Sequence, residues 1–332
     1  MSMKALVYTG KQEVVYRDEP APVSTDNEVL VAIKASGICG SDMHAYHGHD
    51  ERRVPPLILG HEAAGIATSG KFKDRAVAIN PITTCGNCLA CLSGRTNVCS
   101  EREIIGMRLA GAFAEYVSIN ESNLIAVPEG LGLNKASLME PAAVSLHSVV
   151  LSERVLARPL TECSTLVLGA GAIGLLAALV LQQKGAREIY VSEPSETRRS
   201  MVAKQVDCKT FDPRAKDQPA NDSFDLVIDA VGSGITRADA SRFVSPGGVI
   251  SHIGLQDNEA GLDTRKLTLQ EVTFIGNYTY TATDLIAALQ AIADGSLGSL
   301  DWLDERPMTE GSRAFGDLDS GDGASPKIIL IP

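Results

Sequence analysis

The sequence predicts an α/β protein in which a doubly wound parallel sheet accompanies a second, mainly β domain. Three observations carry this prediction. STLVLGAGAIGLLAALVLQQKG has the pattern of a buried strand, a glycine turn and an apolar helix, and strand-like and helical segments alternate after it. By contrast, roughly the first 130 residues are punctuated by Gly, Pro and short β-rich runs. A chain of 332 residues is long enough for two such cores.

Three short runs in the first part of the chain are predicted strands, namely KALVYTG, EVLVAIKASG and RAVAINP. They show little sustained helical periodicity, so we expect an irregular, mostly β domain. From about Asn134 the pattern changes, and NKASLMEPAAVSLHSVVLS is predicted to be helical.

The later part of the chain supplies the strands of the parallel sheet. Its candidates are EIYVSEP, FDLVIDAVG, GVISHIG and VTFIGNY, separated by helical or loop segments. After Tyr280 we expect a helix in ATDLIAALQAIADG, then a loop rich in Gly, Asp and Ser, and a last strand in PKIILIP.

Composition and charge exclude several classes of protein. Hydrophobic residues make up 44% and charged residues 21%, as in ordinary globular domains. The net charge of -11 and the pI near 5.1 disfavour attraction to a polyanion, so we expect no nucleic-acid partner. The opening MSMKALVYTGKQEVVYRDEP becomes charged before an apolar signal segment can form, and no apolar run reaches membrane-spanning length. We therefore expect a cytoplasmic protein with no membrane partner.

The glycine turn has the spacing of a dinucleotide-binding loop. Gly169, Gly171 and Gly174 form GxGxxG between a predicted strand and a predicted helix, with Ala172 and Ile173 inside the loop. The first glycine permits a tight turn, the second lets the backbone approach a pyrophosphate, and the third allows close packing of helix on strand. The phosphates would then lie at a helix N-terminus. A glycine turn without a ligand is the alternative, and the strand-turn-helix context argues against it. This context is typical of a Rossmann domain.

Glu193 lies 19 residues beyond Gly174, at the end of the next predicted strand. A carboxylate there would accept hydrogen bonds from the adenosine ribose hydroxyls and repel a 2'-phosphate, which favours NAD over NADP. Arg198 and Arg199 would favour a phosphate instead. We interpret them as solvated helix residues, so NAD is the predicted cofactor.

Four of the seven cysteines lie within fifteen residues, in the pattern C-x2-C-x2-C-x7-C. In a reducing compartment this clustering favours metal ligation over disulfides. Four thiolates close a tetrahedral zinc shell with no open position, so the predicted site is structural. An iron-sulfur cluster would accept the same ligands, and chance clustering of buried thiols is a further alternative. The residues are Cys85, Cys88, Cys91 and Cys99.

A second set of metal donors comes from GICGSDMH and GHE. Cys39, His61 and Glu62 offer a thiol, an imidazole and a carboxylate, and mixed ligands with an open position are typical of catalytic zinc. Taken alone, Cys39 would be a small buried hydrophobe and His61 a hydrogen-bonded core residue. Their combination with the four-cysteine segment and the Rossmann unit favours the metal.

With these motifs, the chain resembles the zinc-containing medium-chain alcohol dehydrogenases, and among them the sorbitol, butanediol and threonine dehydrogenase branch. The resemblance spans nearly the whole length. It implies that Cys39 and His61 are zinc ligands and that Glu62 or Glu140 completes the shell, leaving a position for water or substrate. Glu140 stands where the ethanol branch has a third cysteine. Either glutamate could instead orient a ligand without binding the metal.

The resemblance also implies a proton relay and a nicotinamide site. Ser41 followed by His44 is similar to the family's relay from the substrate oxygen, through a serine and the nicotinamide ribose, to an imidazole near solvent. Capping a helix is the alternative role for Ser41. In the family the nicotinamide lies against backbone at strand ends, which here are Asp229, Val231, Gly232, Ile253 and Leu255.

The implied fold is a GroES-like domain over residues 1–140, completed by residues 277–332, with a Rossmann domain over residues 141–276. The stretch GIATSGKFKDRAVAINP is shorter than the family's usual loop, and we expect it to alter only a surface turn.

We therefore expect a zinc-dependent oxidoreductase that transfers a hydride between NAD(H) and a secondary alcohol or polyol, which becomes a ketone. Two ligand sets predict two zinc ions per chain. Tyr46, Ile105 and Met107 are expected in the substrate pocket, and a homodimer or homotetramer is the expected assembly. The alternatives are a non-catalytic nucleotide-binding homologue and an NADPH-linked carbonyl or quinone reductase, both of which should lack the ligand set.

Overall fold

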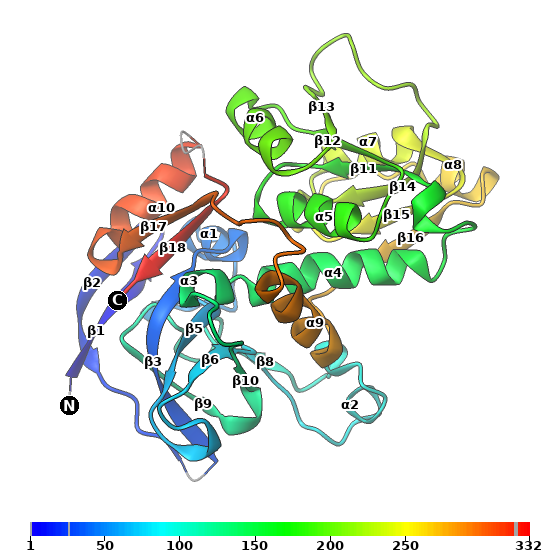
Figure 1. The fold of residues 1–332 in the computed structure, drawn as a ribbon. Helices are drawn as coiled ribbons and strands as arrows, with labels where there is room; N and C mark the ends of the chain where they lie inside the picture. The colour runs from blue at the N-terminus through cyan, green and yellow to red at the C-terminus, as the bar shows by residue number, and fades with distance from the viewer. Residues whose placement is uncertain (1, 26, 322–324) are drawn as a thin grey trace. The chain divides into compact units, whose positions relative to one another are not determined.

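The computed structural model describes residues 2–25, 27–321 and 325–332 and divides into two compact units (Figure 1). Unit 1 comprises Met1–Glu140, Thr281–Asp294 and Leu300–Pro332. Unit 2 comprises Pro141–Tyr280 and Gly295–Ser299. No helix in the described ranges is both long enough and apolar enough to cross a membrane.

Unit 1 is built mainly on antiparallel strands. Its larger sheet has the order β10-β6-β5-β3-β18-β17, and β9 also pairs with β3. The strands are β3 (Glu28–Gly37), β5 (Glu62–Ala67), β6 (Ala76–Ile79), β9 (Tyr116–Asn120), β10 (Leu124–Ala126), β17 (Leu303–Pro307) and β18 (Lys327–Ile331). A smaller sheet has the order β2-β1-β4, from β1 (Ser2–Gly10), β2 (Glu13–Pro20) and β4 (Leu57–Ile58). β7 (Ile82–Thr83) pairs with β8 (Glu103–Ile104).

The last strand of the chain lies inside the larger sheet of unit 1, not at its edge. β18 pairs in parallel with β17 and antiparallel with β3, so that Leu330 lies opposite Ser36 (Figure 1). Residues 327–330 of β18 are buried, as the apolar run IILI requires. The sheet that holds β3 and β5 therefore depends on the end of the chain.

The segment between residues 294 and 321 departs from the expected Gly/Asp/Ser-rich loop. It contains β17 and the helix α10 (Gly311–Ser320). Gly311, Ala314 and Phe315 are buried on one face of α10, and the Phe315 ring packs at 6.1 Å from Phe113 and 5.4 Å from Tyr46. The expectation was wrong because loop-forming residue types occupy the exposed face, while a few apolar residues at helical spacing form the buried one.

The other helices of unit 1 are short except for α9. They are α1 (Gly40–Tyr46), α2 (Leu89–Leu92), α3 (Leu133–Ala136) and α9 (Ala282–Ala293). α9 matches the predicted helix and begins with a capping box, in which Thr281 and Asp284 satisfy each other's backbone amides.

Unit 2 contains the parallel sheet. Its described strands have the order β13-β12-β11-β14-β15-β16, and every pairing among them is parallel. They are β11 (Ser164–Leu168), β12 (Glu188–Ser192), β13 (Lys209–Phe211), β14 (Phe224–Asp229), β15 (Val244–His252) and β16 (Thr273–Gly276). The helices are α4 (Met139–Glu153), which starts in unit 1, α5 (Ala172–Gln183), α6 (Glu196–Gln205), α7 (Gly234–Phe243) and α8 (Thr264–Leu269). The predicted doubly wound sheet is confirmed. Its order turns back at β11, the strand that precedes the glycine turn.

Candidate metal and cofactor sites

The structure brings Cys39, His61 and Glu62 together, with one ligand atom of each within 4.8 Å of the others. Cys39 follows the end of β3, and His61 and Glu62 stand at the start of β5. These two strands are antiparallel neighbours in which Gly37 lies opposite Glu62, so the end of one strand meets the start of the other. A Cβ atom on Gly37 would overlap the Glu62 carboxylate, which explains the glycine before Ile38.

Asp42 supports two of these residues, and the sequence reasoning missed it. Its side chain is fully buried, and Oδ2 accepts a hydrogen bond from the Cys39 amide at 3.0 Å. Oδ1 lies 3.6 Å from Nδ1 of His61, and both atoms are buried without a hydrogen-bond partner among the described residues. A carboxylate at this place suits an imidazole that binds a metal through Nε2, because the other nitrogen then carries a proton toward the carboxylate. The available signal was the acidic residue three positions after Cys39.

Glu62 has a partner from the far end of the chain. Lys327, the first residue of β18, places Nζ 2.8 and 2.7 Å from the two carboxylate oxygens and 2.9 Å from the Ile38 carbonyl. Both side chains are buried. Burial alone would lower the pKa of Lys327, but the charge of Glu62 raises it above the usual value. No motif in the sequence predicts this residue either. Its signal was one lysine at the start of an otherwise apolar strand.

Glu140 is also buried, in the first turn of α4. Among the described residues, it is not one of the donors within 4.8 Å of each other around Cys39. Burial, followed by the charges of Glu62, Asp42 and Glu140, raises the pKa of the Cys39 thiol to about 12, against an opposing effect of Lys327. These three carboxylates therefore place negative charge around Cys39, and a bound cation would offset that charge.

Ser41 lies beside the imidazole of His61, with 3.5 Å between Oγ and Nε2. Its alternative role as the cap of α1 is wrong. Cys39 is the N-cap, its Sγ accepts from the Ser41 amide at 3.5 Å, and Asp42 completes a capping box. The Ser41 hydroxyl is therefore free of the cap. His44 stands in the last turn of α1, where burial first, and then the charges of His49 and Arg53, lower its pKa.

The four cysteines also converge, as a separate group in unit 1. Their sulfur atoms lie within 4.8 Å of one another, at 3.5 Å for Cys88 and Cys91, 3.5 Å for Cys99 and Cys85, and 4.0 Å for Cys85 and Cys91. Tetrahedral zinc with Zn–S bonds of ~2.3 Å separates its sulfurs by about 3.8 Å. The arrangement fits that geometry.

The glycine loop in unit 2 has the close approaches that its motif predicts. Gly169 has a φ of 93°, and a Cβ atom on Gly174 would overlap the Gly169 carbonyl. Gly171 is the N-cap of α5, so Ala172 and Ile173 are the first residues of that helix. Their backbone amides stand in the first turn, where a helix leaves its amides without internal partners.

Glu193 lies next to this loop. Its two carboxylate oxygens accept hydrogen bonds from the amides of Ala170 and Ser195, each at 2.9 Å. Arg199 donates to the carbonyls of Glu193 and Pro194 and lies 3.7 Å from Asp212. The Nε of Arg198 is buried without a hydrogen-bond partner among the described residues.

The residues predicted for the nicotinamide end follow β14 and β15. The amides of Ile253 and Gly254 donate to the Asp229 carbonyl at 2.9 and 3.0 Å, and Asp229 Oδ1 accepts from the amides of Val231 and Gly232. Leu255, beyond them, is 68% exposed. The carboxyl ends of two neighbouring strands are thus tied together.

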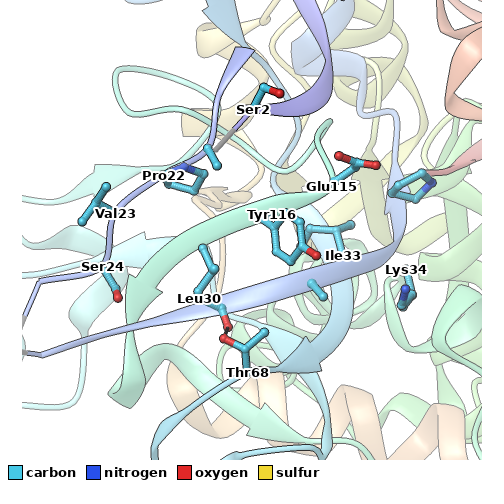
Figure 2. A pocket seen from close by; sticks show the side chains of 13 residues that line it. Ser2, Pro22, Val23, Ser24, Leu30, Ile33, Lys34, Thr68, Glu115 and Tyr116 are labelled. Carbon is cyan, nitrogen blue, oxygen red and sulfur yellow. Dashed lines mark hydrogen bonds between the residues drawn. The ribbon is translucent and has the colours of Figure 1, made fainter. Parts of the chain in front are cut away.

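The residues expected in the substrate pocket, Tyr46, Ile105 and Met107, all belong to unit 1. Tyr46 and Ile105 are buried members of two apolar clusters in unit 1. Met107 lines an open hollow of about 470 Å³ together with Val54 and Arg108. A larger hollow of about 820 Å³ holds none of the predicted site residues. Figure 2 shows its labelled side chains, among them Ser2 of β1, Val23 after β2, Leu30 of β3, Thr68 just after β5 and Tyr116 of β9.

Comparison with known proteins agrees with both units. Residues 25–129 match a family described as "Alcohol dehydrogenase GroES-like domain", and residues 172–294 match one described as "Zinc-binding dehydrogenase". The chain is 32% identical over 309 residues to an L-galactonate-5-dehydrogenase of Escherichia coli, covering 89% of each chain. It is 28% identical to a (R,R)-butanediol dehydrogenase of Saccharomyces cerevisiae, covering 99% of this chain and 98% of the relative. A zinc-binding dehydrogenase from Sinorhizobium meliloti, solved with NADP bound, superposes with a TM-score of 0.89 at 25% identity and covers 100% of both chains.

Proposed function

This chain belongs to the zinc-containing medium-chain alcohol dehydrogenases, in the branch of the polyol and threonine dehydrogenases, and from that premise we propose how its residues serve the reaction. It is a zinc-dependent oxidoreductase that transfers a hydride between a nicotinamide dinucleotide and an alcohol or polyol, which becomes a ketone. The convergence of Cys39, His61 and Glu62 from two neighbouring strands is the observation that supports a catalytic centre in unit 1.

Cys39 and His61 would hold the catalytic zinc, with Asp42 behind the imidazole. Zinc bound there would polarise the substrate oxygen and lower its pKa. Because Lys327 contacts both oxygens of Glu62, that carboxylate would have to be shared between two cations to act as a ligand. Glu140, although outside the group of donors within 4.8 Å of one another, would then supply the carboxylate ligand, and Glu62 would balance the charge of Lys327.

The test is the zinc content of intact protein, measured by native mass spectrometry. Wild type is expected to carry two zinc ions, one for each ligand group. Glu140→Ala should lose the catalytic ion, whereas Glu62→Gln, which keeps the size of the side chain, should retain both. Loss of zinc from Glu62→Gln with retention in Glu140→Ala would reverse this assignment.

Ser41 and His44 would move the proton. As hydride leaves the carbon of the alcohol, the hydroxyl proton must leave a buried site. Ser41, next to His61, would accept it and pass its own proton on toward His44, which is half-buried in the last turn of α1. The lowered pKa of His44 leaves its ring neutral at neutral pH, in the form that can accept a proton.

NAD would be the preferred cofactor. Two backbone amides hold the Glu193 carboxylate beside the glycine loop, so it cannot easily turn away from a 2'-phosphate. Arg199 is already engaged by two carbonyls and Asp212, which leaves Arg198 as the arginine with the freer guanidinium of the two. The relative from S. meliloti binds NADP, so this preference needs a direct comparison of the two cofactors.

Open-chain polyols and aldonic acids would be the substrates. Two relatives carry the names of an L-galactonate and a butanediol dehydrogenase, and both of these substrates bear secondary hydroxyl groups. A panel of galactonate, idonate, sorbitol, xylitol and 2,3-butanediol, each assayed with NAD and NADP, should identify the alcohol. A panel without any turnover in zinc-loaded protein would contradict the proposed substrate class.

Two copies would join along β16. This strand lies at the edge of the sheet in unit 2, and Phe274 on it is 39% exposed. An edge strand with an exposed aromatic side chain offers both unpaired backbone groups and apolar area to a second copy. A homodimer built on that edge is the proposed minimal assembly.

A further inference from the structure

Arg53 is a buried cation next to Ser41, and nothing described above explains it. Its side chain is 0% exposed, although arginine is among the residues least often buried. The neighbouring Arg52 is 48% exposed, so the chain places one arginine in solvent and the next one inside. Burying a guanidinium is costly unless it is paired and hydrogen-bonded.

Three hydrogen bonds fix the guanidinium of Arg53. One terminal nitrogen lies 2.5 Å from Asp50 Oδ2, and Nε donates to the Gly106 carbonyl at 2.9 Å. The other terminal nitrogen donates to Ser41 Oγ at 3.0 Å and lies 3.7 Å from Asp42 Oδ1. Because the guanidinium is planar, two anchored nitrogens determine the direction of the third.

The anchors themselves are well fixed. Burial alone would raise the pKa of Asp50, but hydrogen bonds from Arg52 and the charge of Arg53 lower it to about 2, so this carboxylate stays ionised. Gly106 has a φ of 74°, and a Cβ atom there would come within 2.6 Å of the Gly60 carbonyl, just before His61. Arg53 thus connects the carbonyl of Gly106, a residue that packs against Gly60 just before His61, to the hydroxyl of Ser41.

This contact limits what the Ser41 hydroxyl can do. A hydroxyl group has one proton to donate and two lone pairs, whereas a guanidinium only donates. Arg53 therefore occupies one lone pair of Ser41. The remaining lone pair can accept one proton, and the hydroxyl's own proton must point to a different acceptor.

We propose that Arg53 is a positioning residue that fixes the direction of proton transfer through Ser41. During alcohol oxidation the substrate O–H bond breaks as a bond forms to the open lone pair of Ser41. The original Ser41 O–H bond breaks in the same transfer, and that proton passes on toward His44. Reduction of the ketone runs the same steps in reverse. The inference rests on the proposed role of Ser41 and adds the residue that orients it.

The experiment is a double-mutant cycle with Arg53→Met, Ser41→Ala and the double variant, assayed with the best alcohol of the panel. Arg53→Met should lower kcat by about tenfold or more, with a much smaller change in KM. In the Ser41→Ala background the same substitution should add less than about twofold, because its target is gone. Arg53→Lys, which retains a charged donor, should recover part of kcat. Arg313→Met is the control, since it removes an arginine of unit 1 whose side chain is 77% exposed, and its kcat should stay near wild type.

Zinc content and Tm, measured on every variant, separate this role from a structural one. If Arg53 only holds the loop in place, Tm should fall and the losses of kcat for Arg53→Met and Ser41→Ala should multiply in the double variant, which overturns the proposal. An unchanged kcat in Arg53→Met also overturns it. If Arg53→Met does not fold, Arg53→Lys replaces it in the double-mutant cycle with Ser41→Ala. Losses of kcat that multiply in that double variant would overturn the proposal in the same way. A normal kcat in Ser41→Ala would instead remove the serine relay of the proposed function, and this inference with it.

Discussion

Lys327 constrains the role of Glu62, the carboxylate that the GHE motif identifies. The GHE motif places Glu62 beside Cys39 and His61, but the ion pair with Lys327 determines which charge that carboxylate balances. The two residues are 265 positions apart in sequence, so no local pattern connects them. The pair is buried on both sides, where the loss of one partner leaves an uncompensated charge.

Lys327→Met should therefore destabilise the protein by about 3–5 kcal/mol, the usual cost of breaking a buried pair. The measurement is equilibrium urea unfolding of zinc-loaded protein, followed by tryptophan fluorescence of Trp302 in unit 1. Lys327→Met combined with Glu62→Gln serves as the control and should recover part of the loss, because no buried charge remains. A double variant that is less stable than Lys327→Met would show that the carboxylate matters for another reason.

Glu193→Ala should narrow or invert the preference for NAD. The carboxylate that opposes a 2'-phosphate is removed, and Arg198 can then pair with the phosphate. Like charges brought together in an interface cost several kcal/mol, whereas an exposed ion pair contributes about 0–1 kcal/mol. The ratio of kcat/KM for NAD and NADP, in wild type and in Glu193→Ala, is the measurement. Arg198→Ala is the matched control and should leave the wild-type ratio in favour of NAD; an enzyme that prefers NADP from the start would contradict the assignment.

At the scale of single residues, the sequence predicted the candidate metal donors but not the buried side chains that support them. Cys39, His61 and the four cysteines stand in short motifs whose spacing carries the information. Arg53 and Lys327 act through contacts to Ser41 and Glu62 that only the fold creates. Asp42 contacts the amide of Cys39 locally, but its approach to His61 also depends on the fold. A buried arginine and a surface arginine look alike in sequence, as Arg52 and Arg53 illustrate, because burial depends on what packs against the loop.

Among the elements, the segment that carries the four cysteines has little apolar packing of its own. Leu89 and Leu92 of α2 are 84% and 75% exposed, and Val98 is 41% exposed. A segment without a core needs another source of stability, and a closed metal shell is the one that its thiols can provide. The loop fold of residues 85–99 should therefore depend on zinc.

Cys99→Ala should lower Tm and make residues 85–99 sensitive to limited proteolysis, because structural zinc contributes directly to folding. Cys39→Ala should abolish turnover while the protease resistance of this segment stays at the wild-type level. Peptide mapping of the digests, together with zinc content, distinguishes the two variants. Equal loss of stability in both would contradict the division into a structural and a catalytic metal.

The elements that the sequence predicted well are those with long apolar runs. The buried strands and apolar helix around the glycine turn stand out because burial on both faces of a parallel sheet leaves continuous apolar runs. α10 and β17 did not stand out, since GSRAFGDLDS and LDERP are polar by composition and bury only a few residues each. Their place is decided by tertiary packing on β18 and on the core around Phe113.

For the whole molecule, the proposed homodimer should depend on β16. Phe274→Lys puts a charge on the edge of the sheet, so the Kd of the dimer should rise by about tenfold or more. Size exclusion coupled to light scattering should then measure a molar mass closer to that of the monomer. Val23→Lys is a matched control, because Val23 is an exposed apolar residue of unit 1, and it should leave the mass unchanged. A stable dimer in Phe274→Lys would place the interface elsewhere.

The position of β18 inside its sheet also has a consequence for how the protein is made. A ribosome releases residues 141–280 while Lys327 and β18 are still unsynthesised, so the parallel sheet of unit 2 can form first. Glu62 and β3 are translated hundreds of residues before Lys327 and β18, the lysine and the strand that they contact. A message truncated before Lys327 would therefore yield a product that retains the dinucleotide-binding sheet without a completed catalytic unit.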